Sequence, residues 1–263
     1  MKTLLSHRNF PWLASGIAGV LFIAIAAYVF SGGSPHELAF NRALQGMRIG
    51  LLDAIAICIT LSGDTIVLIW IAAAMIGALA YNRQYRLAAT VLAASVATPL
   101  LVMALKGWVQ RPRPTIDLYH GVEAFSFPSG HTTNSAVLYG ILMLLAYSHI
   151  FGRQRMWLAS MLGALIVLIG LSRIYLAAHW PTDVIAGWCI ASIVLALVSV
   201  VIRKQAVVQQ RERTVLWVAG AGAIFGLAYG AFNFAKAAEK YQPRIAIEVT
   251  LHKVSSPDFT PVG

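Results

Sequence analysis

The sequence predicts an all-α, polytopic membrane helix bundle with a six-span core, a seventh span and a short tail. Of its 263 residues, 59% are hydrophobic and only 11% are charged, whereas soluble globular proteins carry about a quarter charged residues. Seven apolar runs each have the ~20 residues that cross the ~30 Å hydrocarbon core of a bilayer. A chain of this length leaves room for one such domain.

The expected spans follow one another along the chain, separated by short polar segments. The first run follows Pro11 and is long enough to cross the bilayer, so we expect a span there and not a cleaved signal peptide. The seven runs lie near residues 12–30, 64–82, 87–107, 131–151, 156–177, 182–202 and 214–234.

The segment 36–62 differs from the spans. Glu37, Arg42 and Arg48 recur at near-helical spacing among apolar residues, which predicts an amphipathic helix lying on the membrane surface. The run 51–61 that follows has only about 11 residues. Because that is too short to cross a bilayer, we expect it to be interfacial or re-entrant.

The chain loses its hydrophobicity after the seventh run. Residues 244–254 alternate apolar and polar side chains, the pattern of a short strand. We therefore divide the chain into a membrane core at 1–204, an additional transmembrane helix at 205–235 and an extracytoplasmic tail at 236–263.

The formal net charge of +10 reflects topology and an anionic ligand better than nucleic-acid binding, because the basic residues are spread between apolar runs. With the N-terminus in the cytoplasm, ten basic residues fall on each side of the membrane. Orientation follows the basic residues of short loops. If Lys106, Arg111, Arg113 and Arg173 belong to a binding site, they no longer count toward orientation. The side that holds the N-terminus then carries more basic loop residues, which favours a cytoplasmic N-terminus.

Polar groups gather where four of the spans begin or end. The third span ends in KGWVQRPRP, the fourth begins at PSGH, the fifth ends in SRIYLAAH and the sixth begins at WPTD. Because the third and fourth spans form one hairpin and the fifth and sixth another, these groups reach the same membrane face. The set comprises Lys106, Arg111, Arg113, Ser129, His131, Arg173, His179 and Asp183.

This set has the chemistry of a phosphate cradle. The arginine fork matches phosphate oxygens, and lysine adds a point charge. Ser129 and Gly130 precede a helix, whose start offers free N–H groups and the positive end of its dipole to an anion. Two histidines in such a cradle indicate phosphoryl transfer, one attacking phosphorus and the other protonating the leaving oxygen.

The expected catalysis uses protein groups alone. Asp183 lies four residues after His179 and can hold its imidazole in one tautomer. The sequence offers no carboxylate cluster for magnesium or calcium and no His/Cys spacing for zinc. We therefore expect no cofactor and no metal, with side-chain cations stabilising the transition state.

Three motifs in these segments resemble those of the type 2 phosphatidic acid phosphatase superfamily. The first is Lys106 with Arg113-Pro114, the second is PSGH at 128–131, and the third is Ser172-Arg173 with His179 and Asp183. Arg111 lies outside the pattern, and it either contacts a second phosphate or faces lipid headgroups.

The resemblance implies a role for each matched residue. His179 would be the nucleophile that forms a phosphohistidine, Asp183 would assist it, and His131 would be the general acid. The phosphoryl oxygens would be bound by Lys106, Arg113, Ser129, Gly130 and Arg173.

The resemblance also implies a lipid phosphatase of the bacterial inner membrane, with its site on the extracytoplasmic side and no obligate protein partner. Undecaprenyl diphosphate is the expected substrate, while phosphatidylglycerophosphate, phosphatidic acid and lipid A phosphate stay open. A lipid phosphotransferase would use the same site. A vanadium haloperoxidase is disfavoured by the seven spans, and a non-enzymatic transporter or scaffold by the complete His and Asp set.

Overall fold

The computed structural model describes residues 10–32, 35–114, 121–150, 152–205 and 212–242. Within these residues it contains helices and loops and no strand, which confirms the all-α fold class. The expected strand at 244–254 lies outside the described residues. The helices are α1 Phe10–Phe30, α2 Pro35–Gly46, α3 Gly50–Leu61, α4 Thr65–Tyr81, α5 Tyr85–Val109, η1 Gly121–Ala124, α6 Gly130–His149, α7 Gly152–Tyr175, α8 Pro181–Gln205 and α9 Glu212–Lys240.

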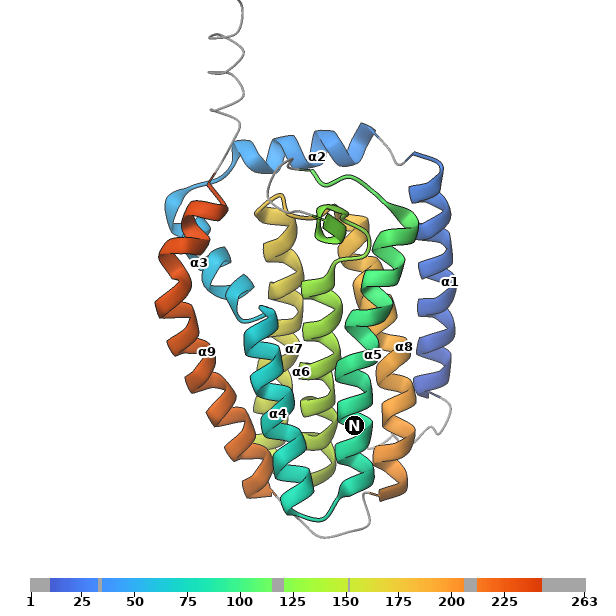
Figure 1. The fold of residues 1–263 in the computed structure, drawn as a ribbon, viewed down its shortest axis with the longest axis vertical. Coiled ribbons are helices and arrows are strands. Elements are labelled where there is room, and N and C mark those ends of the chain that lie inside the picture. Colours follow the sequence, from blue (N-terminus) through green and yellow to red (C-terminus); the bar gives the residue numbers. More distant parts are fainter. Residues whose placement is uncertain (1–9, 33–34, 115–120, 151, 206–211, 243–263) are drawn as a thin grey trace, which may run out of the picture.

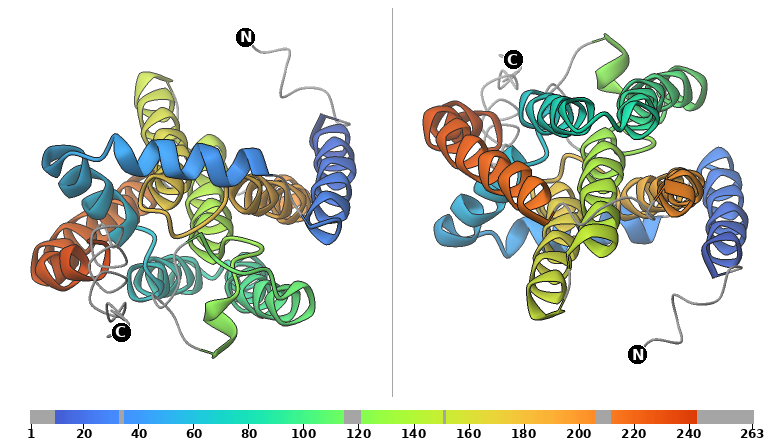
Figure 2. Two further views of the ribbon diagram at one scale, coloured as in Figure 1. Left: turned by 90° about the horizontal axis from the view of Figure 1, so that it is seen from above. Right: turned by 90° about the horizontal axis from the view of Figure 1, so that it is seen from below.

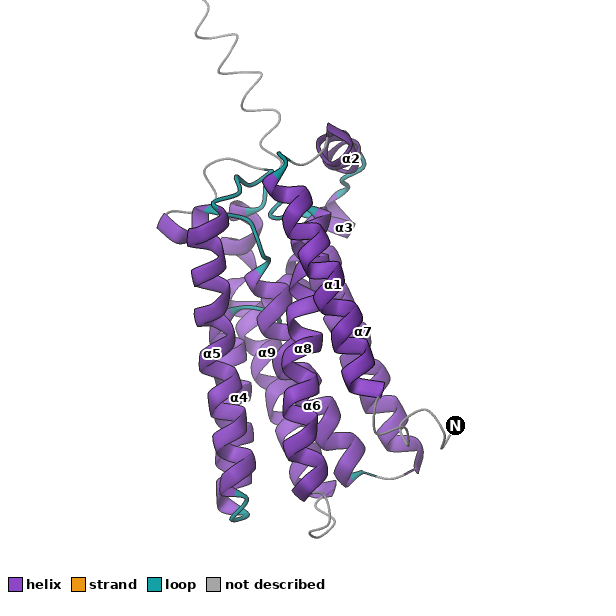
Figure 3. Ribbon diagram, turned by 90° about the vertical axis from the view of Figure 1, so that its right-hand side faces the viewer, coloured by secondary structure: helices purple, strands orange, loops and turns teal. Residues whose placement is uncertain are grey.

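The bundle is organised around α6, which contacts α4, α5, α7, α8 and α9 (Figures 1 and 2). Its buried side chains Val137, Ile141 and Ala146 lie in the main apolar cluster. The outer helix α1 packs along α8, and α9 packs along α3 and α4 on the opposite side of the bundle. This antiparallel arrangement brings the ends of α5 and α7 and the starts of α6 and α8 to one end of the molecule (Figure 1), the end at which α2 lies in Figure 3.

The amphipathic segment forms the roof of that end. Helix α2 lies across the bundle, and α3 descends from it after a bend of 117°. Helix α4 then continues down the same side, so α3 and α4 are two short helices separated by a polar break at residues 62–64. The break places Asp64, whose side chain is partly buried, beside the start of α6.

The exterior of the bundle is that of an integral membrane protein. Among the described residues, five helices are long and apolar enough to cross a membrane: α1, α5, α7, α8 and α9. Large apolar side chains such as Val20, Leu100, Met161 and Leu227 are more than half exposed along them, which is unfavourable in water over so large an area. Helix α4 has only 17 residues, so the count of seven spans remains a prediction.

Candidate active site

The charged residues of the three motifs meet at the roofed end of the bundle. Lys106 lies in the last turn of α5, Arg173 in the last turn of α7 and Asp183 in the first turn of α8. Each of them is almost fully buried, as are Arg113 and His179. Burying an unpaired charge is very unfavourable, so each of these side chains is expected to have a partner. The identity of those partners shows how the site is built.

The PSGH turn is fixed to α8. Ser129 caps α6, where its Oγ accepts a hydrogen bond from the Thr132 N–H, and its own N–H donates to the Asp183 carbonyl at 3.1 Å. Helix α8 approaches this closely because residue 187 is glycine: a Cβ there would lie 2.8 Å from Thr133 Oγ1. At Gly130 a Cβ would meet only Val102, at an ordinary 3.5 Å. The start of α6, where the N–H groups of a helix have no partner within the helix, is thus held against α8 next to Asp183.

The contacts of His179 identify its tautomer. Its Nε2 lies 3.0 Å from Arg113 Nη1, and its Nδ1 lies 3.4 Å from Asp183 Oδ2. A guanidinium can only donate hydrogen bonds, so Nε2 is the acceptor and Nδ1 carries the proton that faces Asp183. The Trp180 N–H also donates to Asp183 Oδ2, at 3.0 Å. Nε2 thus holds the lone pair that a nucleophile needs.

The surroundings of His179 keep its ring neutral. Burial lowers the pKa of His179 well below 6.5, and the nearby charges of Arg113, Arg173 and Lys106 lower it further. An imidazole attacks phosphorus only in its neutral form. The cations around His179 therefore favour the form of the ring that could attack phosphorus.

We expect the His179 ring of the substrate-free protein to remain neutral as the pH falls through 6.5, the ordinary value for histidine. A depressed pKa means that the proton binds only at lower pH, so the neutral form persists on the acidic side. NMR titration of protein labelled with ¹³C-histidine would measure this, with the signal assigned by comparison with His179→Gln. A ring that is protonated at or above pH 6.5 would contradict the expectation.

Glu123 balances two of the cations. Lys106 Nζ donates to Glu123 Oε2 at 2.5 Å, and Arg113 Nη2 lies 3.7 Å from the same oxygen. Burial opposes ionisation of this carboxyl, but the hydrogen bond and charge of Lys106 outweigh it and lower the pKa of Glu123. The Glu123 side chain is 57% exposed. The sequence motifs do not include Glu123, which comes from η1.

Arg173 lies on the α3 and α9 side of the site. Its Nη1 donates to Thr60 Oγ1 at 2.7 Å and to the Tyr241 hydroxyl at 2.8 Å. His131 stands at the start of α6, where its Nε2 lies 2.9 Å from Asp64 Oδ1. Asp64 and Tyr241 are outside the three motifs.

Arg111 contacts the carboxylate of Asp183 and is largely buried. Its Nη1 donates to Asp183 Oδ1 and its Nη2 to Glu37 Oε2 of α2, each at 2.6 Å. Thr182 Oγ1 also donates to Glu37 Oε1, at 2.8 Å. The structure therefore gives Arg111 a third role, in which it links Asp183 to the roof helix.

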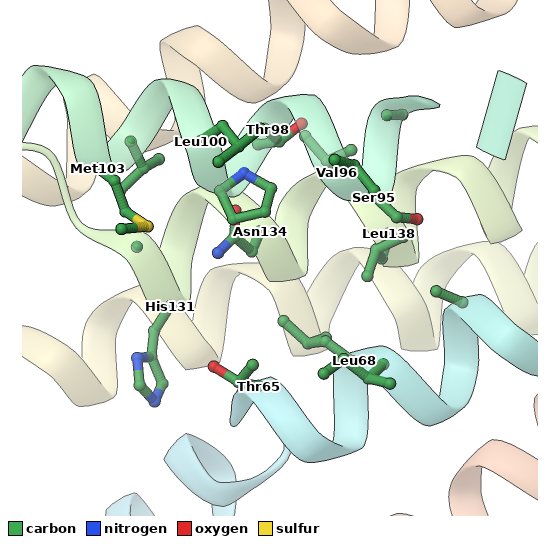
Figure 4. A pocket seen from close by; sticks show the side chains of 18 of the residues that line it. Thr65, Leu68, Ser95, Val96, Thr98, Leu100, Met103, His131, Asn134 and Leu138 are labelled. Carbon is green, nitrogen blue, oxygen red and sulfur yellow. The ribbon is translucent and has the colours of Figure 1, made fainter. Parts of the chain in front are cut away.

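An apolar cleft runs from this site into the bundle between α4, α5 and α6 (Figure 4). It has a volume of about 510 Å³, and Glu123 and His131 line it next to the cradle. Apolar side chains make up most of its remaining wall, among them Leu68, Leu138 and Met103. The cluster of buried cations therefore adjoins an apolar cleft of the kind that fits a lipid chain.

Comparison with known proteins agrees with the motifs. The family model of the PAP2 superfamily matches residues 84–206, which contain all three motifs. Phosphatidylglycerophosphatase B of Bacillus subtilis is 34% identical over 101 residues, or 38% of this chain, and the chain spans about half the length of that relative, 50%. The undecaprenyl-diphosphatase of Sulfolobus acidocaldarius is 28% identical over 183 residues, covering 66% of this chain and 84% of that protein.

A solved structure shares the fold. The crystal structure of a transmembrane PAP2-type phosphatidylglycerolphosphate phosphatase from Bacillus subtilis superposes with a TM-score of 0.64 at 26% identity, covering 72% of this chain and 96% of that chain. The same fold thus accompanies a family match over the segment that holds all three motifs. Residues 84–206 therefore match the PAP2 superfamily, and the chain is similar in fold to a solved PAP2-type phosphatase.

Proposed function

We propose that this protein is a lipid phosphatase that hydrolyses a phosphate monoester or diphosphate through a phosphohistidine on His179. The observation that carries the proposal is the position of His179 Nε2 within a ring of buried cations. The adjoining apolar cleft supports a lipid substrate, because a chain held there leaves its phosphate at His131.

The proposed reaction has two steps. In the first, His179 Nε2 attacks phosphorus, the bond to the leaving oxygen breaks, and His131 gives that oxygen its proton. In the second, His131 takes a proton from a water that attacks the phosphohistidine, which releases phosphate and restores His179. Lys106, Arg113, Arg173 and the N–H of Gly130 at the start of α6 would hold the phosphoryl oxygens in both steps. Ser129, which caps α6 and donates its own N–H to Asp183, would shape this turn of the binding site.

Two substrate classes follow from the relatives' names, a phosphatidylglycerophosphate and an undecaprenyl diphosphate. Undecaprenyl diphosphate is the first choice, supported by a relative that is aligned over 84% of its length. Phosphatidic acid and lipid A phosphate present the same phosphate to the cradle. The chemistry at His179 is the same for all of them.

The test is release of phosphate by purified protein in detergent from a panel of these four lipids, with and without EDTA. We expect free phosphate from at least one of them, at a rate unchanged by EDTA, because the charges that bind phosphate here are side chains. Strong inhibition by EDTA would overturn metal independence. Transfer of phosphate to another lipid, with none released, would identify a phosphotransferase.

We also propose that the site faces the extracytoplasmic side of the bacterial inner membrane, supported by the distribution of basic residues. A single cysteine placed after residue 242 reports on this, because Tyr241 lies at the site end of the bundle. In a variant without Cys58 and Cys189, an impermeant reagent applied to intact cells should label that cysteine. Labelling only after lysis would reverse the orientation.

Filling the mouth of the cleft should separate lipid binding from chemistry. Met103 lines the cleft near His131 and is 49% exposed, so a larger side chain is tolerated there (Figure 4). We expect Met103→Trp to raise KM for a long-chain lipid about tenfold, since ~1.4 kcal/mol of lost contact has that effect. Hydrolysis of a short soluble phosphate ester should not change. An unchanged KM for the lipid would show that the chain binds elsewhere.

A further inference from the structure

Helix α9 lies beyond the family match, which ends at residue 206, yet its C-terminal half reaches the site. It packs along α3, α4 and α6 (Figures 1 and 2). Its last turns are held in an apolar cluster in which Ala237 and Tyr241 pack with Leu61 and Leu176. Two tyrosines of this segment, Tyr229 and Tyr241, contact partners of the phosphoryl-transfer machinery.

The first contact reaches the proposed general acid through Asp64. Tyr229 donates its hydroxyl proton to Asp64 Oδ2 at 3.1 Å, and the other carboxylate oxygen, Oδ1, lies 2.9 Å from His131 Nε2. At the neighbouring Gly63 a Cβ would lie 2.9 Å from Ile169 of α7 and at an ordinary 3.5 Å from the His131 ring, so glycine there lets α7 pack closely against this turn. Both oxygens of Asp64 are thus engaged, one by the histidine and one by α9.

The second contact reaches Arg173. Arg173 is fully buried, and its guanidinium carbon lies 5.4 Å from the centre of the Tyr241 ring, while its Nη1 donates to the Tyr241 hydroxyl. Tyr241 is itself anchored, because its carbonyl accepts a hydrogen bond from Arg48 Nη2 at 2.6 Å. Arg48 is fixed in turn by Asp53, with Nε to Oδ1 at 2.9 Å.

We propose that α9 is part of the catalytic machinery: Tyr229 positions the general acid His131 through Asp64, and Tyr241 positions Arg173 on the phosphate. Because Asp64 holds Nε2 of His131, Nδ1 is the nitrogen that gives its proton to the leaving oxygen. After that transfer His131 is neutral, with its remaining proton on Nε2 and shared with Asp64. This assignment rests on the proposed phosphatase function. Within that function, the role of α9 is to position His131 and Arg173.

The two tyrosines should have different kinetic signatures, which general damage to α9 would not produce. On the panel lipid that the unmodified protein hydrolyses fastest, we expect Asp64→Asn to lower kcat about 10²-fold and Tyr229→Phe about tenfold, with KM unchanged, as for a weakened general acid. Tyr241→Phe should instead raise KM about fivefold, because a hydrogen bond to a charged group is lost. Phe232→Leu, an exposed position on the same helix, is the control and should change neither constant.

A second measurement isolates the proton transfer. A nitrophenyl phosphate that carries an octyl chain has a leaving group that needs little protonation, so Asp64→Asn and Tyr229→Phe should affect it less than tenfold. Equal losses on both substrates, or unchanged kcat in Tyr229→Phe, would overturn the proposal while leaving the phosphatase function intact. If the unmodified protein releases phosphate from no substrate, the phosphatase function itself fails.

Discussion

Replacing His179 with alanine is expected to lower phosphate release about 10⁴-fold or more, because the attacking atom is removed and no covalent intermediate can form. His179 Nε2 is the ring atom that faces the cradle, accepting a hydrogen bond from Arg113. The measurement is free phosphate at saturating lipid. His36→Ala, an exposed histidine of α2, is the matched control and should retain activity.

The loss must be shown to be chemical and not structural, because His179 is almost fully buried beside charged groups. His179→Gln retains most of the side-chain volume and should be equally inactive, with thermal unfolding close to that of the unmodified protein. The unmodified protein should also acquire acid-labile ³²P label from a labelled substrate, and neither variant should do so. Residual turnover within tenfold of normal in either variant would identify another nucleophile.

Much of the fold could be predicted because lipid imposes a simple rule on sequence. An apolar run of ~20 residues must become a helix that crosses the bilayer, and the run expected at 131–151 is the helix Gly130–His149. The length of an apolar run does not predict where its helix ends. Helix α9 continues to Lys240, beyond the run that ends at 234, since AKAAEK is a good helix former whether or not lipid surrounds it.

The sequence also predicted that the three motifs lie at one end of the bundle, because consecutive spans run in opposite directions. The supporting residues could not be found in this way. Asp64 meets His131 across 67 residues of chain and Tyr229 across 165, and no local pattern records such pairings. One signal was present: Asp64 is a carboxylate between two apolar runs, where a charge is unfavourable and usually has a partner.

Arg111 shows why residue type alone left its role open. An arginine beside Arg113, the proposed phosphate ligand, suits a second phosphate or a headgroup equally well. Its actual partners come from α2 and α8, and they lie 74 and 72 residues away in the chain. Asp183 therefore lies between two different groups: its Oδ2 faces His179 and its Oδ1 faces Arg111.

Changing Asp183 to asparagine is therefore expected to lower kcat about 10³- to 10⁴-fold, comparable with loss of the carboxylate in a catalytic triad. If the asparagine oxygen faces His179, its amide group meets Arg111, donor against donor. If the amide group faces His179 instead, the ring must move its proton to Nε2, which then meets Arg113 without an acceptor. Either arrangement loses the neutral Nε2 held in place for attack.

The double variant Asp183→Asn with Arg111→Met distinguishes this explanation from simple loss of charge. Removing Arg111 frees the asparagine amide, so its oxygen can again face His179 Nδ1 and restore the tautomer. We expect the double variant to recover about tenfold in kcat over Asp183→Asn alone, although Arg111→Met by itself lowers activity. Losses that simply add would mean that Arg111 and Asp183 act independently, contrary to their 2.6 Å contact.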